Sequence, residues 1–155
     1  PGGRRVGFDE VERLVREKSA ILIDVLPTDG EGADPETGAW SLRHPHRSIP
    51  GAVWLPDVGR GRLDAGLEHY FAAELQRLTG GDKARPLVIF CQSDCWMGWN
   101  AAMRAARLGY LSVLWYAEGS DGWRDWDGNL NEAVPVPMQP SDARSRREPM
   151  SAPPD

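Results

Sequence analysis

Cysteine is nearly absent from this chain, which has two, Cys91 and Cys95, among 155 residues. Two thiols are too few for the disulfide framework of a small secreted scaffold, and a structural zinc site needs four ligands. Long apolar runs are also missing, because the longest, AILIDVL and PLVIFC, fall far short of the ~20 residues that span a bilayer. The sequence therefore excludes a disulfide-rich scaffold and predicts no membrane-spanning helix.

Runs of basic residues are the third absence. The formal net charge is -5, and no run of Lys and Arg interleaved with aromatic residues is present to follow a phosphate backbone. We therefore expect no nucleic-acid partner. What the chain does have is an apolar fraction of 41% in a length typical of one domain, which is enough for a hydrophobic core.

Strand-like and helix-like segments alternate along the chain. Short apolar runs typical of buried strands occur at residues 20–26, 51–56, 86–91 and 112–117. Apolar residues at helical spacing, or good helix formers, occur at residues 8–19, 67–81 and 100–110. This alternation predicts an α/β fold with a central, mostly parallel sheet of about five strands, flanked by helices on both faces.

The composition changes near the C-terminus. Residues 1–134 are predicted to form a single domain, whereas residues 135–155 are rich in Pro, Ser and Arg and poor in apolar side chains. Such a composition buries too little apolar surface to fold by itself. We therefore expect residues 135–155 to form a flexible tail.

Cys91 stands at the end of a predicted buried strand, where the chain turns toward the next helix. In open parallel sheets, ligands bind beyond the carboxyl ends of the strands. Backbone N–H groups converge there and the helix dipole is positive, and both effects favour a thiolate. Cys91 is therefore the candidate nucleophile. The alternative is a small buried side chain that only ends a core strand.

Cys95 follows four residues later. Within one helical turn, residues at this spacing have Cα atoms about 6 Å apart, which is within disulfide range. If the loop curls in this way, Cys95 can resolve a persulfide on Cys91 or cycle with it as a redox pair. The alternative is a structural disulfide that only fixes the loop.

The other residues of this loop are predicted to shape the site: Gln92, Ser93, Asp94, Trp96, Met97, Gly98, Trp99 and Asn100. Asp94 is expected to cap the following helix, and Asn100 to hydrogen-bond within the loop. Trp96 and Trp99 are expected to pack in the core, with a pocket lining as the alternative. Asp24, which follows another predicted strand, is expected to support the site by accepting hydrogen bonds from loop N–H groups.

A soft-metal site is a further alternative for the thiols. Together with His44, His46 and Met97, the two cysteines would suit copper if the loops met. Two ordinary surface histidines are the simpler interpretation, and we predict no resident metal or cofactor.

Several short motifs occur in a characteristic order: ILIDV at 21–25, SIPGA at 48–52, VIFC at 88–91, AARLGY at 105–110 and EGSDGW at 118–123. In this order and approximate spacing, the chain resembles the rhodanese-like domains, which are sulfurtransferases and their relatives. The resemblance covers roughly residues 8–130. It implies a rhodanese-like fold and a thiolate or persulfide on Cys91.

A narrower resemblance comes from the CxxxCW core with the following WNAA, and from the WYxEGxDGW pattern at 115–123. These patterns are similar to a rhodanese-like subgroup associated with pyrroloquinoline-quinone-dependent alcohol catabolism in bacteria. That likeness implies a periplasmic or secreted protein, with a quinoprotein dehydrogenase or another periplasmic protein as a partner.

The chain also departs from the family at positions that matter for substrate choice. Leu26 and Ser48 stand where the family often has Arg and His, so a dianionic donor such as thiosulfate is disfavoured. Phosphatase relatives need an Arg six residues beyond the Cys, and this position is Met97. Phosphatase activity is therefore not expected.

We thus expect a sulfurtransferase or thiol-redox protein that acts on a small sulfur donor or thiol acceptor through Cys91, with Cys95 as the resolving thiol. A non-catalytic accessory module is the main alternative. In that case a structural disulfide and a tryptophan-rich loop would dock a partner such as an alcohol dehydrogenase.

Overall fold

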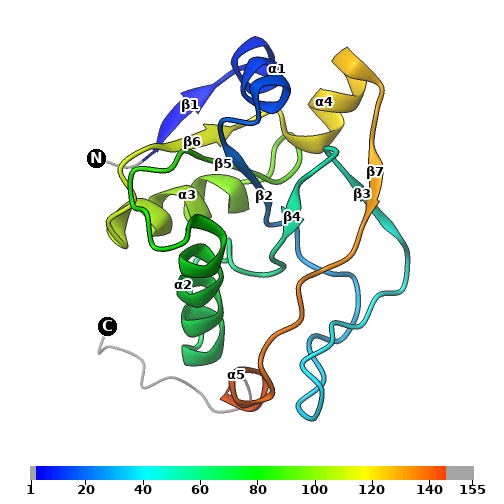
Figure 1. Cartoon of the computed structure of the whole chain (residues 1–155). Coiled ribbons are helices and arrows are strands. Elements are labelled where there is room, and N and C mark those ends of the chain that lie inside the picture. Colours follow the sequence, from blue (N-terminus) through cyan, green and yellow to red (C-terminus); the bar gives the residue numbers. More distant parts are fainter. Residues whose placement is uncertain (1–2, 146–155) are drawn as a thin grey trace.

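The computed structural model describes residues 3–145, and its centre is a five-stranded sheet (Figure 1). The strand order is β1-β6-β5-β2-β4, and every neighbouring pair is parallel. The strands are β1 (Arg4–Val6), β2 (Ile21–Asp24), β4 (Val53–Trp54), β5 (Leu87–Phe90) and β6 (Val113–Tyr116). The predicted parallel sheet of about five strands is confirmed.

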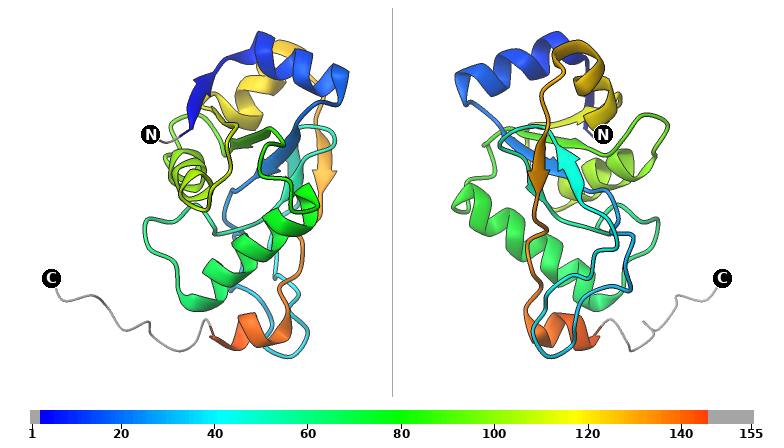
Figure 2. Two further views of the ribbon diagram at one scale, coloured as in Figure 1. Left: turned by 60° about the vertical axis from the view of Figure 1, so that its left-hand side comes forward. Right: turned by 90° about the vertical axis from the view of Figure 1, so that its right-hand side faces the viewer.

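Helices cover both faces of this sheet (Figure 2). Two helices, α1 (Phe8–Glu17) and α4 (Gly119–Asp127), lie on one face, and α2 (Ala65–Thr79) and α3 (Met97–Arg107) lie on the other. Successive side chains of a strand point to opposite faces. Leu87 and Ile89 accordingly join the apolar cluster under α2 and α3, whereas Val88 and Phe90 join the cluster under α1 and α4.

The second helix shows how local sequence sets the bounds of an element. The side chain of Asp64 accepts a hydrogen bond from the backbone N–H of Leu67, which caps the start of α2. The helix ends at Gly80, whose φ of 64° lies in the left-handed region that glycine adopts without strain. The predicted glycine cap is confirmed, but the predicted start at residue 67 is two residues late because Asp64 was not recognised as the cap.

A small antiparallel ribbon lies beside the sheet and consists of β3 (His46–Ser48) and β7 (Asn131–Ala133). Its strands have three residues each, too few for a clear alternation of apolar and polar side chains. The sequence therefore did not reveal it. No helix among residues 3–145 has both the length and the apolar character needed to cross a membrane.

The structure differs from the expected domain boundary after residue 134. The backbone N–H of Val136 donates to the carbonyl of Trp54 at 2.9 Å, and Met138 is buried. Helix α5 (Pro140–Ser145) then packs against α2, with Ala143 buried. A few well-placed apolar residues hold this segment, although its average composition is polar. Residues 146–155 of the expected tail lie outside the described residues.

Candidate functional site

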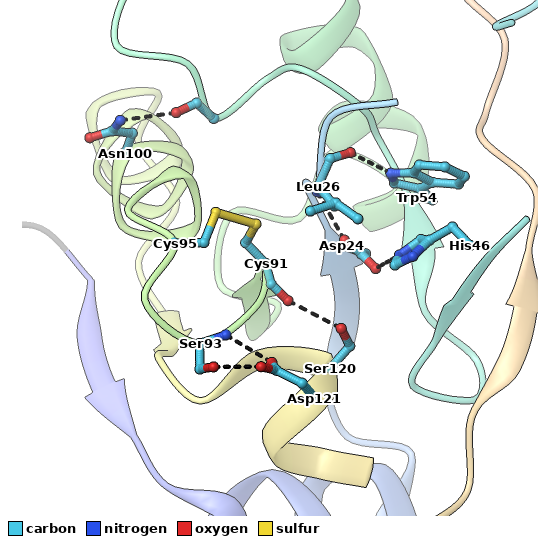
Figure 3. Close-up of a disulfide and its surroundings, with 11 residues drawn as sticks. Asp24, Leu26, His46, Trp54, Cys91, Ser93, Cys95, Asn100, Ser120 and Asp121 are labelled. Atoms are coloured by element: carbon cyan, nitrogen blue, oxygen red, sulfur yellow. Dashed lines mark hydrogen bonds and ion pairs between the residues drawn. A yellow bond between two sulfur atoms is a disulfide. The ribbon is translucent and has the colours of Figure 1, made fainter. Parts of the chain in front are cut away.

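The two cysteines form a disulfide at the carboxyl edge of the sheet (Figure 3). Cys91 directly follows β5 and is 1% exposed, whereas Cys95 is partly exposed. The backbone N–H of Cys95 donates to the carbonyl of Gln92 at 3.2 Å, and Asp94 between them has a φ of 62°. This turn brings the two Cα atoms to 6.1 Å. The loop therefore curls as the sequence required for the two thiols to meet.

The first part of α4 holds the backbone at Cys91. The Cys91 carbonyl accepts hydrogen bonds from the backbone N–H of Ser120 at 3.1 Å and from its hydroxyl at 3.4 Å. Gly119 has a φ of 69° and pairs with Gln92 in an isolated β-bridge. A Cβ on Gly119 would lie 2.6 Å from the Cys91 carbonyl oxygen, so only glycine fits there.

Asp121 fixes the next residue of the loop. The backbone N–H of Ser93 donates to Asp121 Oδ1 at 2.8 Å, and the Ser93 hydroxyl donates to Oδ2. Partial burial tends to raise the pKa of Asp121, but hydrogen bonds from Ser93 and from the backbone N–H groups of Asp121 and Gly122 together outweigh it, and the pKa is lowered. Gly119, Ser120 and Asp121 were not predicted as site residues. Their EGSDGW motif was visible, but its contact with the cysteine loop was not.

The start of α3 packs tightly behind Cys91. A Cβ on Gly98 would lie 3.0 Å from the indole nitrogen of Trp115 and 3.3 Å from the Cys91 backbone nitrogen. The predicted helix cap is wrong, because the N-cap position is Trp96, no side chain caps it, and Asp94 is exposed in its left-handed turn.

Asn100 makes its hydrogen bond outside the loop, contrary to expectation. Its side-chain amide donates to the carbonyl of Gly59 at 3.0 Å. Arg104, which the sequence did not single out, donates from the same helix to the carbonyls of Val58 at 2.6 Å and Arg60 at 3.0 Å. The two side chains tie the segment between β4 and α2 to α3.

The tryptophans of the loop differ from each other in burial. Trp96 is 69% exposed and stacks on Trp115, with ring centroids 6.1 Å apart. Trp99 is partly buried and meets the same ring edge-on at 5.3 Å. The expected core packing is therefore wrong for Trp96, which lines a pocket instead. Met97 between them is partly buried against the cluster under α2 and α3.

This pocket has a volume of about 250 Å³ and lies beside Cys95. Its lining consists of Arg5, Asp94, Cys95, Trp96, Trp115 and Ala117. The guanidinium of Arg5 lies over the Trp115 ring, 5.6 Å from its centroid. Cys95 therefore borders an open aromatic pocket that also contains a cation and a carboxylate.

Asp24 is fully buried at the end of β2, next to the cysteine strand. It accepts a hydrogen bond from the backbone N–H of Leu26 at 2.9 Å, as expected of an acceptor for the loop. Its other oxygen accepts from the hydroxyl of Ser48 and contacts Nε2 of His46, each at 2.6 Å. The Asp24 carboxylate thus joins the carboxyl end of β2 to β3.

The residues of the possible copper site do not come together. His44 Nδ1 lies 2.7 Å from Asp29, His46 contacts Asp24, and the two cysteines are bonded to each other. Among residues 3–145, no group of three or more His, Cys, Asp or Glu side chains is arranged to hold a metal ion.

Comparisons with known proteins agree with the fold described above. The family model of the rhodanese-like domain matches residues 8–125, and no curated protein matches the chain. Among solved structures, the human single-domain sulfurtransferase TSTD1 is 23% identical at a TM-score of 0.50, with 80% of this chain and 97% of that chain covered. The BH2092 protein of Bacillus halodurans is 18% identical at a TM-score of 0.54, with 83% and 77% covered.

A third similar structure is that of EanB carrying a cysteine persulfide, solved with ergothioneine. It is 20% identical at a TM-score of 0.52, and the match covers 86% of this chain but 32% of EanB. At such identities these structures show the shared fold alone. Because the family model spans most of the sequence, the chain belongs to the rhodanese-like domain family.

Proposed function

We propose that this chain is a sulfurtransferase that carries sulfane sulfur on Cys91 and releases it with the help of Cys95. The observation that carries the proposal is the disulfide between a thiol at the end of a buried strand and a second thiol one turn later. Such a pair has both the nucleophile and the resolving group of a persulfide cycle.

The cycle begins with the reduced protein. The Cys91 thiolate attacks the outer sulfur of a persulfide donor, RS–SH, so that a persulfide forms on Cys91 and RS⁻ leaves. The Cys95 thiolate then attacks Sγ of Cys91, and hydrosulfide leaves as the disulfide forms. Two protein thiols are oxidised in the cycle, and two equivalents of an external thiol restore them.

The residues of the loop itself favour a donor of low charge. The start of α3 has no side-chain cap, so its first backbone N–H groups are available to stabilise an anion on sulfur. In contrast, no Lys or Arg occurs among residues 92–100, and Met97 stands where phosphate-binding relatives need Arg. We therefore propose persulfides or polysulfides as donors in preference to thiosulfate.

We further propose that the protein acts in the periplasm or outside the cell, beside a quinoprotein alcohol dehydrogenase. The CxxxCW and WYxEGxDGW patterns support this association, and a disulfide is typical of oxidising compartments. Fractionation of cells that produce the full-length protein tests the location. Recovery in the cytoplasmic fraction alone would contradict it.

Mass spectrometry tests the chemistry directly. Reduced wild-type protein exposed to a polysulfide should gain sulfur transiently and end as the disulfide, with hydrosulfide released. Cys95→Ser should retain one added sulfur on Cys91 because no second thiol resolves the persulfide, whereas Cys91→Ser should form no disulfide within the loop and release no hydrosulfide by that route. If reduced wild type neither gains sulfur nor releases hydrosulfide with any persulfide or polysulfide donor, the proposal is wrong.

A binding module is the second candidate, favoured by the exposure of two large indoles. Trp96 is 69% exposed and Trp126 is 70% exposed, which is unusual for tryptophan. In this case the disulfide would only fix a docking loop for a periplasmic partner. Full biological activity of Cys91→Ser would favour the module and exclude thiol chemistry.

A further inference from the structure

The two cysteines of the disulfide differ in exposure. Cys91 is 1% exposed and belongs to the apolar cluster under α2 and α3, where Leu26 and Met97 also pack. Cys95 is partly exposed and lines the pocket of about 250 Å³. A thiolate must reach a disulfide sulfur to open the bond. In the oxidised protein, an external thiolate can therefore reach Cys95 without moving the core, whereas Cys91 is shielded.

A second hollow on the other side of the loop does not offer a route. It has a volume of about 310 Å³ and is lined by residues that include His46, Gln92, Ser120 and Arg124. Neither cysteine lines it. Of these two hollows, the pocket beside Cys95 is the one that a cysteine of the disulfide lines.

The pocket beside Cys95 also has a defined chemistry. The ring faces of Trp96 and Trp115 supply apolar walls, and Arg5 over the Trp115 ring supplies the positive charge. A carboxylate ligand would meet Arg5, while Asp94 in the same lining would repel it. Arg5 is an exposed residue of β1, at the edge of the sheet, and does not belong to the cysteine loop. Its charge can therefore be removed without changing a loop residue.

We propose that Cys95 is the electrophilic sulfur of the oxidised protein, and that small thiols with a carboxylate reduce it through this pocket. The thiolate RS⁻ attacks Cys95 Sγ, the bond to Cys91 breaks, and Cys91 leaves as a thiolate. A second RS⁻ then attacks the R-bearing sulfur of the mixed disulfide on Cys95, which gives RS–SR and a Cys95 thiolate. The inference rests on the proposed function, because it identifies the step that prepares Cys91 for the next sulfur.

Two measurements of the cysteines test the direction of attack. Oxidised wild type treated with glutathione, quenched with acid and mapped by mass spectrometry should carry glutathione on Cys95. In parallel, Cys91→Ser, which leaves Cys95, should react with oxidised glutathione at least about tenfold faster than Cys95→Ser. Glutathione on Cys91 in wild type, or faster reaction of Cys95→Ser, would overturn the inference.

Pocket variants test the substrate class. The rate of disulfide opening is measured with 3-mercaptopropionate and with the neutral 2-mercaptoethanol, and each rate is divided by that of wild type. Arg5→Gln should slow the carboxylate thiol about threefold and leave the neutral thiol unchanged. Asp94→Asn should speed the carboxylate thiol, and Asn tolerates the left-handed turn at that position.

Arg13→Gln is the matched control, because Arg13 is an exposed arginine on α1 that pairs with Glu17. It should change neither rate. Equal slowing of both thiols by Arg5→Gln would mean that Arg5 shapes the pocket without recognising a carboxylate, and would overturn the substrate class. If Arg13→Gln also slowed the carboxylate thiol, the net charge of the protein would explain the effect and a contact with Arg5 in the pocket would not.

Failure of this inference is separable from failure of the proposed function. If sulfur loads on Cys91 but glutathione does not appear on Cys95, the route of reduction is wrong while the sulfurtransferase stands. If glutathione appears on Cys95 but no sulfur ever loads on Cys91, the protein is a thiol-disulfide exchange protein without sulfur transfer.

Discussion

The two halves of the cysteine loop differ in how they are held. The strand-end half, residues 91–93, is pinned by α4, because Ser120 binds the Cys91 carbonyl and Asp121 binds both hydrogen-bond donors of Ser93. The helix-end half, residues 94–96, is mostly open to solvent. One disulfide thus connects a fixed, buried sulfur with an accessible one.

This difference assigns the two sulfurs to different steps. A thiol beside the uncapped start of α3 suits a group that stores sulfur, because the backbone N–H groups there stabilise the thiolate. An exposed sulfur suits exchange with thiols from solution. Substitution of the residues that hold the strand-end half should therefore lower the free energy of unfolding, whereas substitutions in the helix-end half should mainly alter reactivity.

The largest effect is expected at Gly119. Gly119→Ala would place a Cβ 2.6 Å from the Cys91 carbonyl at a φ of 69°, so we expect a loss of about 3 kcal/mol in the free energy of unfolding. Gly80→Ala is the control, since Gly80 has a similar φ of 64° but no atom within 4 Å of its Cβ position. It should cost about 1 kcal/mol. Equal losses in urea denaturation would mean that backbone strain alone matters.

The next effect is expected at Asp24, which lies beside the end of β5 and joins β2 to β3. Asp24→Ala would leave the Leu26 N–H, the Ser48 hydroxyl and His46 without their acceptor in a fully buried site. We expect a loss of about 2 kcal/mol in unfolding free energy. Asp125→Ala, at a side chain that is 70% exposed, should change it by less than about 0.5 kcal/mol.

A smaller effect is expected from Asp121, with a defined pH dependence. Its pKa is lowered in the folded state, so its stabilisation is complete above the ordinary carboxyl range and is lost as the pH falls through the lowered value. Asp121→Asn should cost about 1 kcal/mol at neutral pH, because the site is partly exposed. The difference from wild type should vanish in acid. A difference that persists at low pH would mean that packing, not charge, holds Ser93.

The smallest effect on stability is expected at Trp96. Trp96→Ala should lower the free energy of unfolding by less than about 0.5 kcal/mol, because the side chain is 69% exposed. Trp115→Ala, at the partly buried ring that Trp96, Trp99 and Arg5 all contact, should cost more. Thermal unfolding of both variants measures the contrast. Equal losses would show that Trp96 is held as firmly as the partly buried Trp115, and would contradict the open character of the helix-end half.

Local patterns were reliable where a single segment decides the outcome. The apolar run at 86–91 predicted β5, and the position of Cys91 at its end followed directly. Patterns failed where the partner is distant in sequence. Asn100 binds Gly59, and Asp94 lies in a left-handed turn that keeps it from capping α3. Neither outcome depends on neighbouring residues alone.

The sequence by itself determined the parallel sheet, the place of Cys91 and the spacing that lets Cys95 reach it, because periodicity and chain geometry are local properties. Only the tertiary structure decided which cysteine is the more exposed, since that depends on α4 holding one half of the loop and on Arg5, Trp96 and Trp115 lining a pocket at the other. Those groups come from separate parts of the chain, and folding alone brings them to one edge of the sheet.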